Sequence, residues 1–169
     1  MTAGPTASGA ERFLARARAA GLSPEVREFP AGTRTAADAA EAIGCDLAAI
    51  VKSLVFIASG SGRERPADDR PVLVLTSGAN RVSESALAEV LGAASVRKAD
   101  AAEVRDATGY AIGGTPPFGH ATDLEVVCDA DLTRLDEVWA AAGTPTTVFA
   151  LTPDALLEVT GARVADVGT

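Results

Sequence analysis

The chain has 169 residues, 47% of them hydrophobic, and a formal net charge of -8 at pH 7. This length favours one domain with its own core. The acidic excess argues against a protein that coats itself in nucleic acid, although it permits a small local contact with an RNA end. No stretch approaches the roughly 20 apolar residues of a membrane span, and the first residues do not resemble a secretory signal. We therefore expect a cytoplasmic protein.

Local signals in the first half predict helices and strands within a domain of residues 10–169, after a flexible segment 1–9. Helices are expected where an N-cap residue precedes an apolar periodicity and a glycine ends it. The predicted elements are, in chain order, a helix 10–20 ended by Gly21, an extended piece 25–30, a helix 36–43 from Thr35 to Gly44, a turn after Asp46, strands 50–57 and 72–77 joined by a polar turn region 60–71, and a helix 84–91 from Ser83 to Gly92.

The second half continues the same mixture. Its predicted elements are a strand 94–99, a helix 101–107 with Asp100 as N-cap and Glu103 at the matching position, a loop 109–120, a strand 124–129, a segment 131–143 with a helix-like start and an alternating end, a strand 146–152, and a helix from Pro153 to Gly161 with Thr152 as N-cap. Strands and helices that are mixed and unevenly spaced predict an α+β fold with a mixed sheet around one core.

Residues that could hold a metal or form a catalytic triad are scarce. His120 is the one histidine, and Cys45 and Cys128 are far apart with no neighbouring ligand. A zinc site needs three or four ligands of this kind. A Ser-His-Asp triad would have to use His120, and no nucleophile elbow accompanies it. We expect no metal and no cofactor.

Lys52 interrupts the apolar run IVKSLVFI, residues 50–57, and Lys98 is the one other lysine of the sequence. The run predicts a strand buried on both faces. A lysine at its start can lay its stem on apolar surface while the ammonium reaches water. It can equally be a fixed cation at the mouth of a pocket, holding phosphate or carboxylate or serving as a base or Schiff-base amine. Ser53 adds a hydroxyl on the other face, or at the same mouth if the strand begins irregularly.

The segment GGTPPFGH, residues 113–120, is the second candidate. Gly113 and Gly114 let a ligand approach the backbone, while Pro116 and Pro117 stiffen the chain that follows. Two glycine amides before a rigid Pro-Pro can cradle an anion or oxyanion. The same residues also suit a tight connection between a helix and the strand 124–129. His120 can be an acid-base group or a polar loop residue.

Three segments together resemble the YbaK/ProX-type aminoacyl-tRNA deacylases, a family also inserted as the editing domain of bacterial prolyl-tRNA synthetases. They are TAADAAEAIGCDLAAIVKSLVF, then VLVLTSGANRVSESALAEVLGAASVRKADAAEVRDATGYAIGGTPPFGH, and LTPDALLEVTGARVADV. The resemblance covers residues 25–167. It implies a mixed, partly barrel-like sheet surrounded by helices, and hydrolysis, in trans, of the ester of a wrongly charged tRNA.

The resemblance also implies site residues. Lys52 would lie at the pocket mouth, and Gly113 and Gly114 would donate amides to the ester. The residues expected to bind substrate are Ser53, Thr115, Pro116, Pro117, Phe118, Gly119 and His120. The expected substrates carry small amino acids, as in Cys-, Ala- or Ser-tRNA. At Thr115 and at His120-Ala121 the sequence departs from common family residues, which leaves substrate choice open. The general base would be a ribose hydroxyl of the tRNA, or, in cysteine-specific members, the substrate thiol would attack its own ester.

The expected partner is the acceptor end of a mischarged tRNA. Lys52 would hold it with arginines near the cleft, such as Arg34, Arg81 and Arg97. The acidic chain implies weak affinity for tRNA, so an aminoacyl-tRNA synthetase or an elongation factor would supply tRNA selectivity. A monomer and a homodimer both stay open. The alternatives in function are a non-catalytic module that binds an aminoacyl or nucleotide-like ligand, and a Schiff-base enzyme at Lys52.

Overall fold

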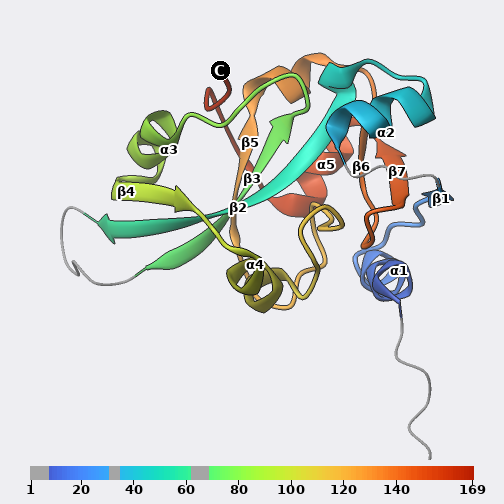
Figure 1. Cartoon of the computed structure of the whole chain (residues 1–169), viewed down its shortest axis with the longest axis horizontal. Helices are drawn as coiled ribbons and strands as arrows, with labels where there is room; N and C mark the ends of the chain where they lie inside the picture. The colour runs from blue at the N-terminus through green and yellow to red at the C-terminus, as the bar shows by residue number, and fades with distance from the viewer. Residues whose placement is uncertain (1–7, 31–34, 62–68) are drawn as a thin grey trace, which may run out of the picture.

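The computed structural model describes residues 8–30, 35–61 and 69–169. One mixed sheet lies between helices, as Figure 1 shows, and the expected α+β class is confirmed. Most of the predicted flexible segment lies outside the described residues, but Ser8 and Gly9 cap and begin the first helix. The central part of the predicted turn region 60–71 also lies outside them. In the part of the chain that is described, no helix has the length and apolarity needed to cross a membrane.

Local capping chemistry sets the helix boundaries. Thr35, Ser83, Asp100 and Thr152 each accept a hydrogen bond from the backbone N–H three residues on, as their sequence positions predicted. The α-helices among the described residues are α1 (Gly9–Ala19), α2 (Ala36–Ile43), α3 (Glu84–Leu91), α4 (Ala101–Thr108) and α5 (Pro153–Thr160). Two short 3₁₀ turns are η1 (Leu47–Ala49), after Asp46, and η2 (Ala130–Arg134).

The strands are β1 (Arg27–Glu28), β2 (Ile50–Ser61), β3 (Arg70–Ser77), β4 (Ala93–Lys98), β5 (Glu125–Asp129), β6 (Val138–Ala141), β7 (Thr147–Leu151) and β8 (Arg163–Ala165). Their order is β1-β7-β6-β2-β3-β5-β8, with β4 added to β2. The described strands do not close into a barrel, so the partly barrel-like shape implied by the resemblance is an open sheet here. The ambiguous segment 131–143 resolves into part of η2 followed by β6, and β8 was not predicted.

Strand β2 is the centre of the sheet and has two different neighbours on one edge. β3 pairs with it along the other edge, antiparallel. On the divided edge, β6 pairs in parallel with Ile50 and Val51, whereas β4 pairs antiparallel from Phe56 onward. Among the described strands, none pairs with Lys52, Ser53 or Leu54 on this edge. The sheet therefore has a break beside the start of β2.

Side chains of β2 alternate between two cores, as the two-sided apolar pattern predicted. Val55 and Ile57 belong to the larger cluster, which includes Phe149. Phe56 belongs to a second cluster with Leu87 of α3, and Leu54 packs against it. Burial on both faces fixes the backbone of β2, so the groups along its unpaired edge are held in place.

Candidate functional site

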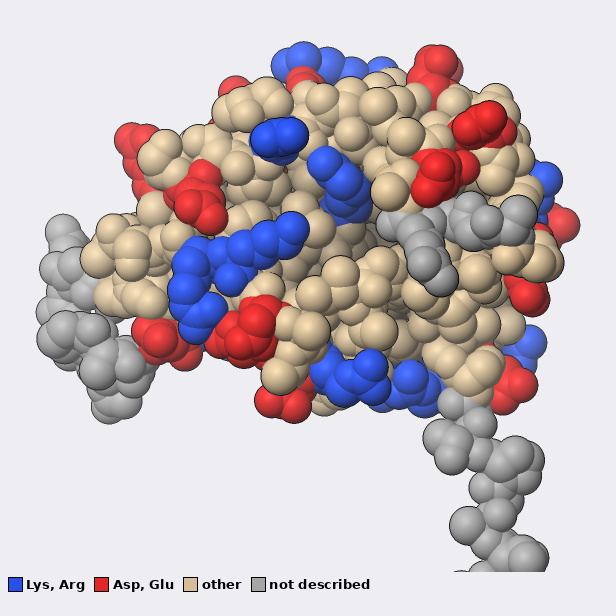
Figure 2. All heavy atoms as spheres, in the orientation of Figure 1, with Lys and Arg blue, Asp and Glu red and all other residues tan. Residues whose placement is uncertain are grey.

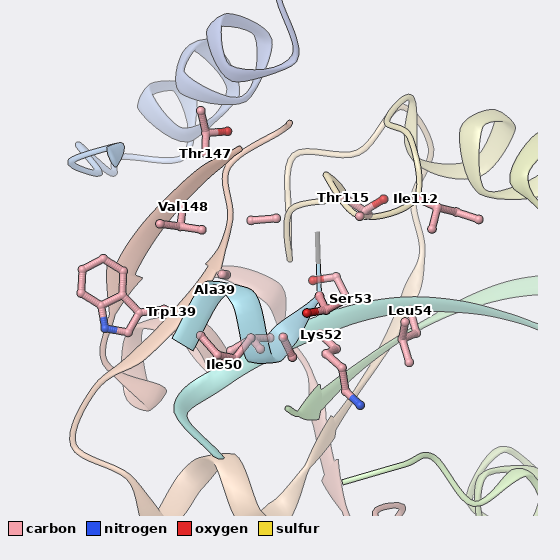
Figure 3. Close-up of a pocket in the computed structure, with 16 residues that line it drawn as sticks. Ala39, Ile50, Lys52, Ser53, Leu54, Ile112, Thr115, Trp139, Thr147 and Val148 are labelled. Carbon is pink, nitrogen blue, oxygen red and sulfur yellow. The ribbon is translucent and has the colours of Figure 1, made fainter. Parts of the chain in front are cut away.

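A small pocket opens at the break in the sheet. It has a volume of about 170 Å³ and is lined mainly by apolar side chains. Its walls come from the start of β2, the turn at residues 112–115, strands β6 and β7, and the N-terminus of α2. Figure 3 shows these segments facing one another around the pocket, with Trp139 on one side and Ile112 on the other. Segments that are distant in the sequence thus form one cavity.

Ser53 presents polar groups to this pocket. Its Oγ is buried and finds no hydrogen-bond partner among the described residues. Its backbone also faces the break, because alternate residues of a strand direct their N–H and C=O groups to the same edge. The C=O of Val55, two residues on, accepts a hydrogen bond from the N–H of Ala99 beyond β4 on that edge. Ser53 therefore offers a hydroxyl and two backbone groups to a ligand at the edge of β2.

Lys52 leaves β2 in the opposite direction from Ser53, as Figure 3 shows. Its Nζ donates a hydrogen bond to the backbone C=O of Asn80 at 2.5 Å. Burial lowers the pKa of the Lys52 ammonium, and the nearby charges of Lys98 and Arg81 lower it further. The ammonium is therefore a half-buried, fixed cation at the pocket margin, in place of the solvent-reaching group that composition alone would allow.

Asn80 is itself held by carboxylates that sequence reasoning did not assign to the site. Its Nδ2 donates to Asp129 at 2.9 Å and to Asp131 at 2.7 Å. Asp129 is buried at the end of β5 and also accepts from the amide of Ser77. A charged residue that directly follows the apolar run of β5 was the one sequence signal for this network. Within the described ranges, no three potential metal ligands gather here or elsewhere.

The turn before Thr115 brings two backbone amides to the pocket. Gly113 has a φ of +88°, which favours glycine, and lines the pocket together with Thr115. The N–H groups of Gly113 and Thr115 have no acceptor in the part of the chain that is described. The N–H of Gly114 instead donates to the C=O of Ala111 at 3.1 Å. The two amides open to a ligand are therefore those of Gly113 and Thr115.

Gly114 has a packing role. A Cβ at this position would lie 2.8 Å from the Cα of Thr144, so glycine permits the turn to pack against the loop between β6 and β7. The structure thus brings four predicted site residues to the pocket: Lys52, Ser53, Gly113 and Thr115. Gly114 stands behind the turn, and its predicted amide contact to substrate stays a prediction.

The remainder of the predicted loop turns away from the pocket. Pro116 is buried, and its C=O lies 2.7 Å from Nε2 of His120. Burial lowers the pKa of His120. Pro117, Phe118, Gly119 and His120 line a separate hollow near β5 and α5. Their predicted contacts with substrate stay predictions.

Phe118 anchors this part of the loop in the core. Its ring centroid lies 5.1 Å from that of Phe13 and 6.0 Å from that of Phe149. Rings at such distances pack favourably beyond the burial of their area. The aromatic cluster therefore fixes the loop from behind.

A second hollow of about 680 Å³ lies next to the pocket and contains three basic side chains, those of Lys52, Arg81 and Lys98. Of the arginines expected near the cleft, Arg81 lines this hollow. Arg97 does not line it, because its guanidinium pairs with Glu103 at 2.8 Å. Arg34 lies outside the described residues. Lys98, which sequence reasoning missed, completes the group.

Comparisons with known proteins show which family the chain belongs to. A sequence model of the aminoacyl-tRNA editing domain matches residues 30–159. The uncharacterized protein YwhH of Bacillus subtilis (strain 168) is 34% identical over 140 residues, which is 83% of each chain. The proline--tRNA ligase of Limosilactobacillus fermentum is 32% identical over 101 residues, 60% of this chain but 17% of the ligase.

Two solved structures are similar to this chain in both fold and sequence. The crystal structure of a proposed trans-editing enzyme for prolyl tRNA synthetase has a TM-score of 0.86 and 41% identity, covering 98% of this chain and 99% of that one. Hypothetical protein APE2540 has a TM-score of 0.82 and 30% identity, covering 94% and 100%. The resemblance found in the sequence is confirmed: the chain belongs to the aminoacyl-tRNA editing domain family.

Proposed function

We propose that this protein hydrolyses the ester of mischarged aminoacyl-tRNA in trans, with the pocket at the free edge of β2 as its active site. One observation carries the proposal. Lys52 and the turn at Gly113, far apart in the sequence, line one small pocket in a chain of the editing family. The four residues that meet there supply a cation, a hydroxyl and unpaired amides, which are groups suited to an ester and its neighbouring phosphate.

The reaction needs little from side chains, because an aminoacyl ester is already activated. Water attacks the carbonyl carbon, the bond from that carbon to the ribose oxygen breaks, and the proton passes to the ribose oxygen. Free amino acid and tRNA are released. The amides of Gly113 and Thr115 would donate to the oxyanion, and a single such donor is typically worth about 3 kcal/mol. A ribose hydroxyl of the tRNA would serve as the general base, so no protein triad is required.

The size of the pocket favours small amino acids. Its apolar walls include Ile50, Trp139 and Val148, and its volume is about 170 Å³. A pocket of this kind acts as a sieve that admits small side chains and excludes large ones. The buried Oγ of Ser53 has no partner among the described residues, and such a group costs about 1–3 kcal/mol. A substrate hydroxyl would satisfy it, so among Cys-, Ala- and Ser-tRNA we expect seryl-tRNA to react fastest.

The alternative is a module that binds an aminoacyl or nucleotide-like ligand without hydrolysing it. The residues Gly113 and Thr115 favour the enzyme, because they line the pocket and their N–H groups have no acceptor among the described residues, so they could donate to the oxyanion. A Schiff base at Lys52 is disfavoured by its Nζ, which donates to Asn80. An association with a synthetase or elongation factor, a monomeric or dimeric state and a cytoplasmic location stay predictions.

A deacylation panel tests the proposal. Cys-, Ala- and Ser-tRNA are incubated with wild type, Lys52→Ala, Lys52→Arg and the control Arg105→Ala, which changes an exposed cation on α4. We expect Lys52→Ala to lower kcat/KM about 100-fold or more, since it removes a fixed charge from the site. Arg105→Ala should retain wild-type activity. The enzyme proposal fails if no mischarged tRNA loses its amino acid faster than in buffer, and retained binding in that case would favour the non-catalytic module.

A further inference from the structure

The two lysines of the sequence, distant along the chain, line the same surface hollow. Lys52 comes from β2 and Lys98 from the end of β4, where the register places Lys98 opposite Phe56. Arg81, from the segment before α3, also lines it. We call the hollow formed around these three cations the basic groove. Figure 2 shows basic side chains gathered over β4 and around a depression on this face.

In the described part of the chain, none of the three cations of the basic groove forms an ion pair, although the charge of Asp129 partly offsets the effect of Lys98 and Arg81 on Lys52. The ion pairs in the described part of the chain use Arg70, Arg97 and Arg134, none of which lines the groove. Glu84 is the one carboxylate among the groove residues, and it forms no ion pair with the three cations. In a chain with a net charge of -8, three cations around one hollow with no ion pair among the described residues are unexpected. Burial lowers the pKa of Lys52, and repulsion from Lys98 and Arg81 lowers it further. A bound anion would relieve this repulsion.

The basic groove adjoins the pocket at the ester position. Lys52 and Leu54 line both hollows, so they form the wall between them. An ester at the free edge of β2, with its amino acid on the Ser53 side, would have its ribose directed toward the groove. The next groups along a tRNA acceptor end are phosphodiesters, each with one negative charge. The groove therefore lies where the substrate has its nearest charges.

The residues of the basic groove suit contacts with phosphate better than contacts with bases. Its one aromatic side chain, Phe56, is 4% exposed and offers no surface for stacking. Single-stranded RNA that is read by base is usually stacked on aromatic rings, whereas phosphate contacts carry no sequence information. We expect this groove to be indifferent to base identity.

We propose that the basic groove binds the phosphodiester backbone of the nucleotides before the terminal adenosine of tRNA, with Arg81 and Lys98 as its phosphate contacts beyond Lys52. This inference rests on the proposed function, because it extends the same substrate from the pocket into the groove. It assigns affinity for tRNA to a short single-stranded end, which is compatible with an acidic protein.

Two substrates separate the groove from the pocket. Seryl-tRNA has the acceptor-end phosphates, whereas 3′-O-seryl-adenosine has the same ester and no phosphate. Wild type, Arg81→Ala, Lys98→Ala and the double variant are compared, with Arg97→Ala and Arg105→Ala as controls for loss of a cation outside the groove. We expect each groove variant to raise KM for seryl-tRNA about 3- to 10-fold with kcat unchanged. For seryl-adenosine, KM should stay at the wild-type value.

Salt dependence supplies a second readout. The plot of log KM against log salt concentration should lose about 0.7 of its slope for each phosphate contact removed. The proposal is overturned if the groove variants affect both substrates equally, or if the slope does not change relative to the two controls.

A binding assay tests the basic groove independently of catalysis. If wild type deacylates neither substrate, the proposed function has failed, and binding of a fluorescent oligoribonucleotide ending in CCA still tests the groove. Anisotropy titrations should show weaker binding by Arg81→Ala and Lys98→Ala, with equal affinity for oligonucleotides of altered base sequence. Equal binding by wild type and double variant would overturn the inference. Binding of inorganic phosphate without any binding of the oligoribonucleotide would also overturn it, because the groove would then be a site for a free anion.

Discussion

Strand β2 and the loop at residues 113–120 are the two parts of the sequence that suggested the site, and the structure uses them differently. Consecutive residues of β2, Lys52 and Ser53, point in opposite directions, yet both line the candidate pocket, because no described strand pairs with this part of the edge. In the loop, Gly113 and Thr115 face the pocket while the following residues turn to another hollow. A strand fixes direction by its period of two, whereas neighbours in a loop need not share a site.

The part of the loop that turns away provides support for the part that faces the pocket. Phe118 lies in the aromatic cluster with Phe13, and the His120 ring contacts the backbone of Pro116. These contacts hold the chain on the C-terminal side of Thr115. Rigid support of this kind allows the few groups of the site to keep their geometry without a ligand.

Within the loop, substitutions at Gly113 and Gly114 have the largest expected effects. They compare a glycine that lines the pocket with a glycine that packs behind the turn. In Gly113→Ala the new methyl group meets no atom within 4 Å, so its cost is the strain of a φ of +88°, about 1–2 kcal/mol. The shifted amide should lower kcat about 10- to 100-fold. In Gly114→Ala the methyl group would crowd Thr144, which should lower the free energy of unfolding by about 1–3 kcal/mol.

Denaturant unfolding and single-turnover deacylation together distinguish the two glycines. The comparison would be contradicted if Gly114→Ala kept its stability and lost activity as Gly113→Ala does. That result would return the Gly114 amide to the site, as the sequence predicted.

Replacement of His120 tests whether the second half of the loop is support or site. Burial lowers the pKa of His120 below its ordinary value of 6.5, so the unfolded chain takes up a proton more readily than the folded one. This contribution to stability is complete above pH 6.5 and is lost as the pH falls through the folded pKa. In His120→Gln, the decrease in the free energy of unfolding between pH 7 and pH 5 should be smaller than in wild type.

Activity supplies the other half of the His120 test. We expect kcat/KM of His120→Gln at pH 7.5 to lie within about threefold of wild type, since His120 lines a hollow separate from the pocket. A loss as large as that of an oxyanion donor, about 100-fold, would show that His120 acts on the substrate.

Ser53→Ala tests the β2 side of the comparison. Because the buried Oγ has no partner among the described residues, its removal should leave the free energy of unfolding unchanged or raise it by about 1 kcal/mol. The ratio of kcat/KM for Ser-tRNA over Ala-tRNA should fall several-fold, while the rate with Ala-tRNA changes little. An unchanged ratio would show that Ser53 does not read the side chain of the amino acid.

Local signals in the sequence predicted much of the fold. Thr35, Ser83, Asp100 and Thr152 cap the helices that they were expected to begin, because capping depends on residues only three positions apart. Strand β8 was missed, since its residues are mostly exposed and carry no alternation. Its partner β5 is distant in the sequence, and pairing with that strand is what makes it extended.

Only part of the candidate site could be predicted, because some of its contacts also depend on residues that are distant in the sequence. Lys52 stood out because a charge inside an apolar run is unusual, and the pairing of Gly113 with it came from a family resemblance. Lys98 and Asn80 carried no comparable signal. Lys98 reaches the basic groove through the register of β4 on β2, and Asn80 contributes a backbone carbonyl, which any residue could supply. Contacts that depend on strand register or on main-chain atoms cannot be predicted from residue types.

The break in pairing beside β2 also bears on whether the sheet could pair with a strand of another chain. A long unpaired strand edge is a template for another chain, and proteins commonly protect such edges by keeping them short or placing lysine on them. Among the described strands, the edge left unpaired between β6 and β4 spans Lys52, Ser53 and Leu54, and it carries a lysine. It is too short to pair with a passing strand. A gap of this length leaves room for the proposed ester but offers little edge for strand pairing with a second polypeptide.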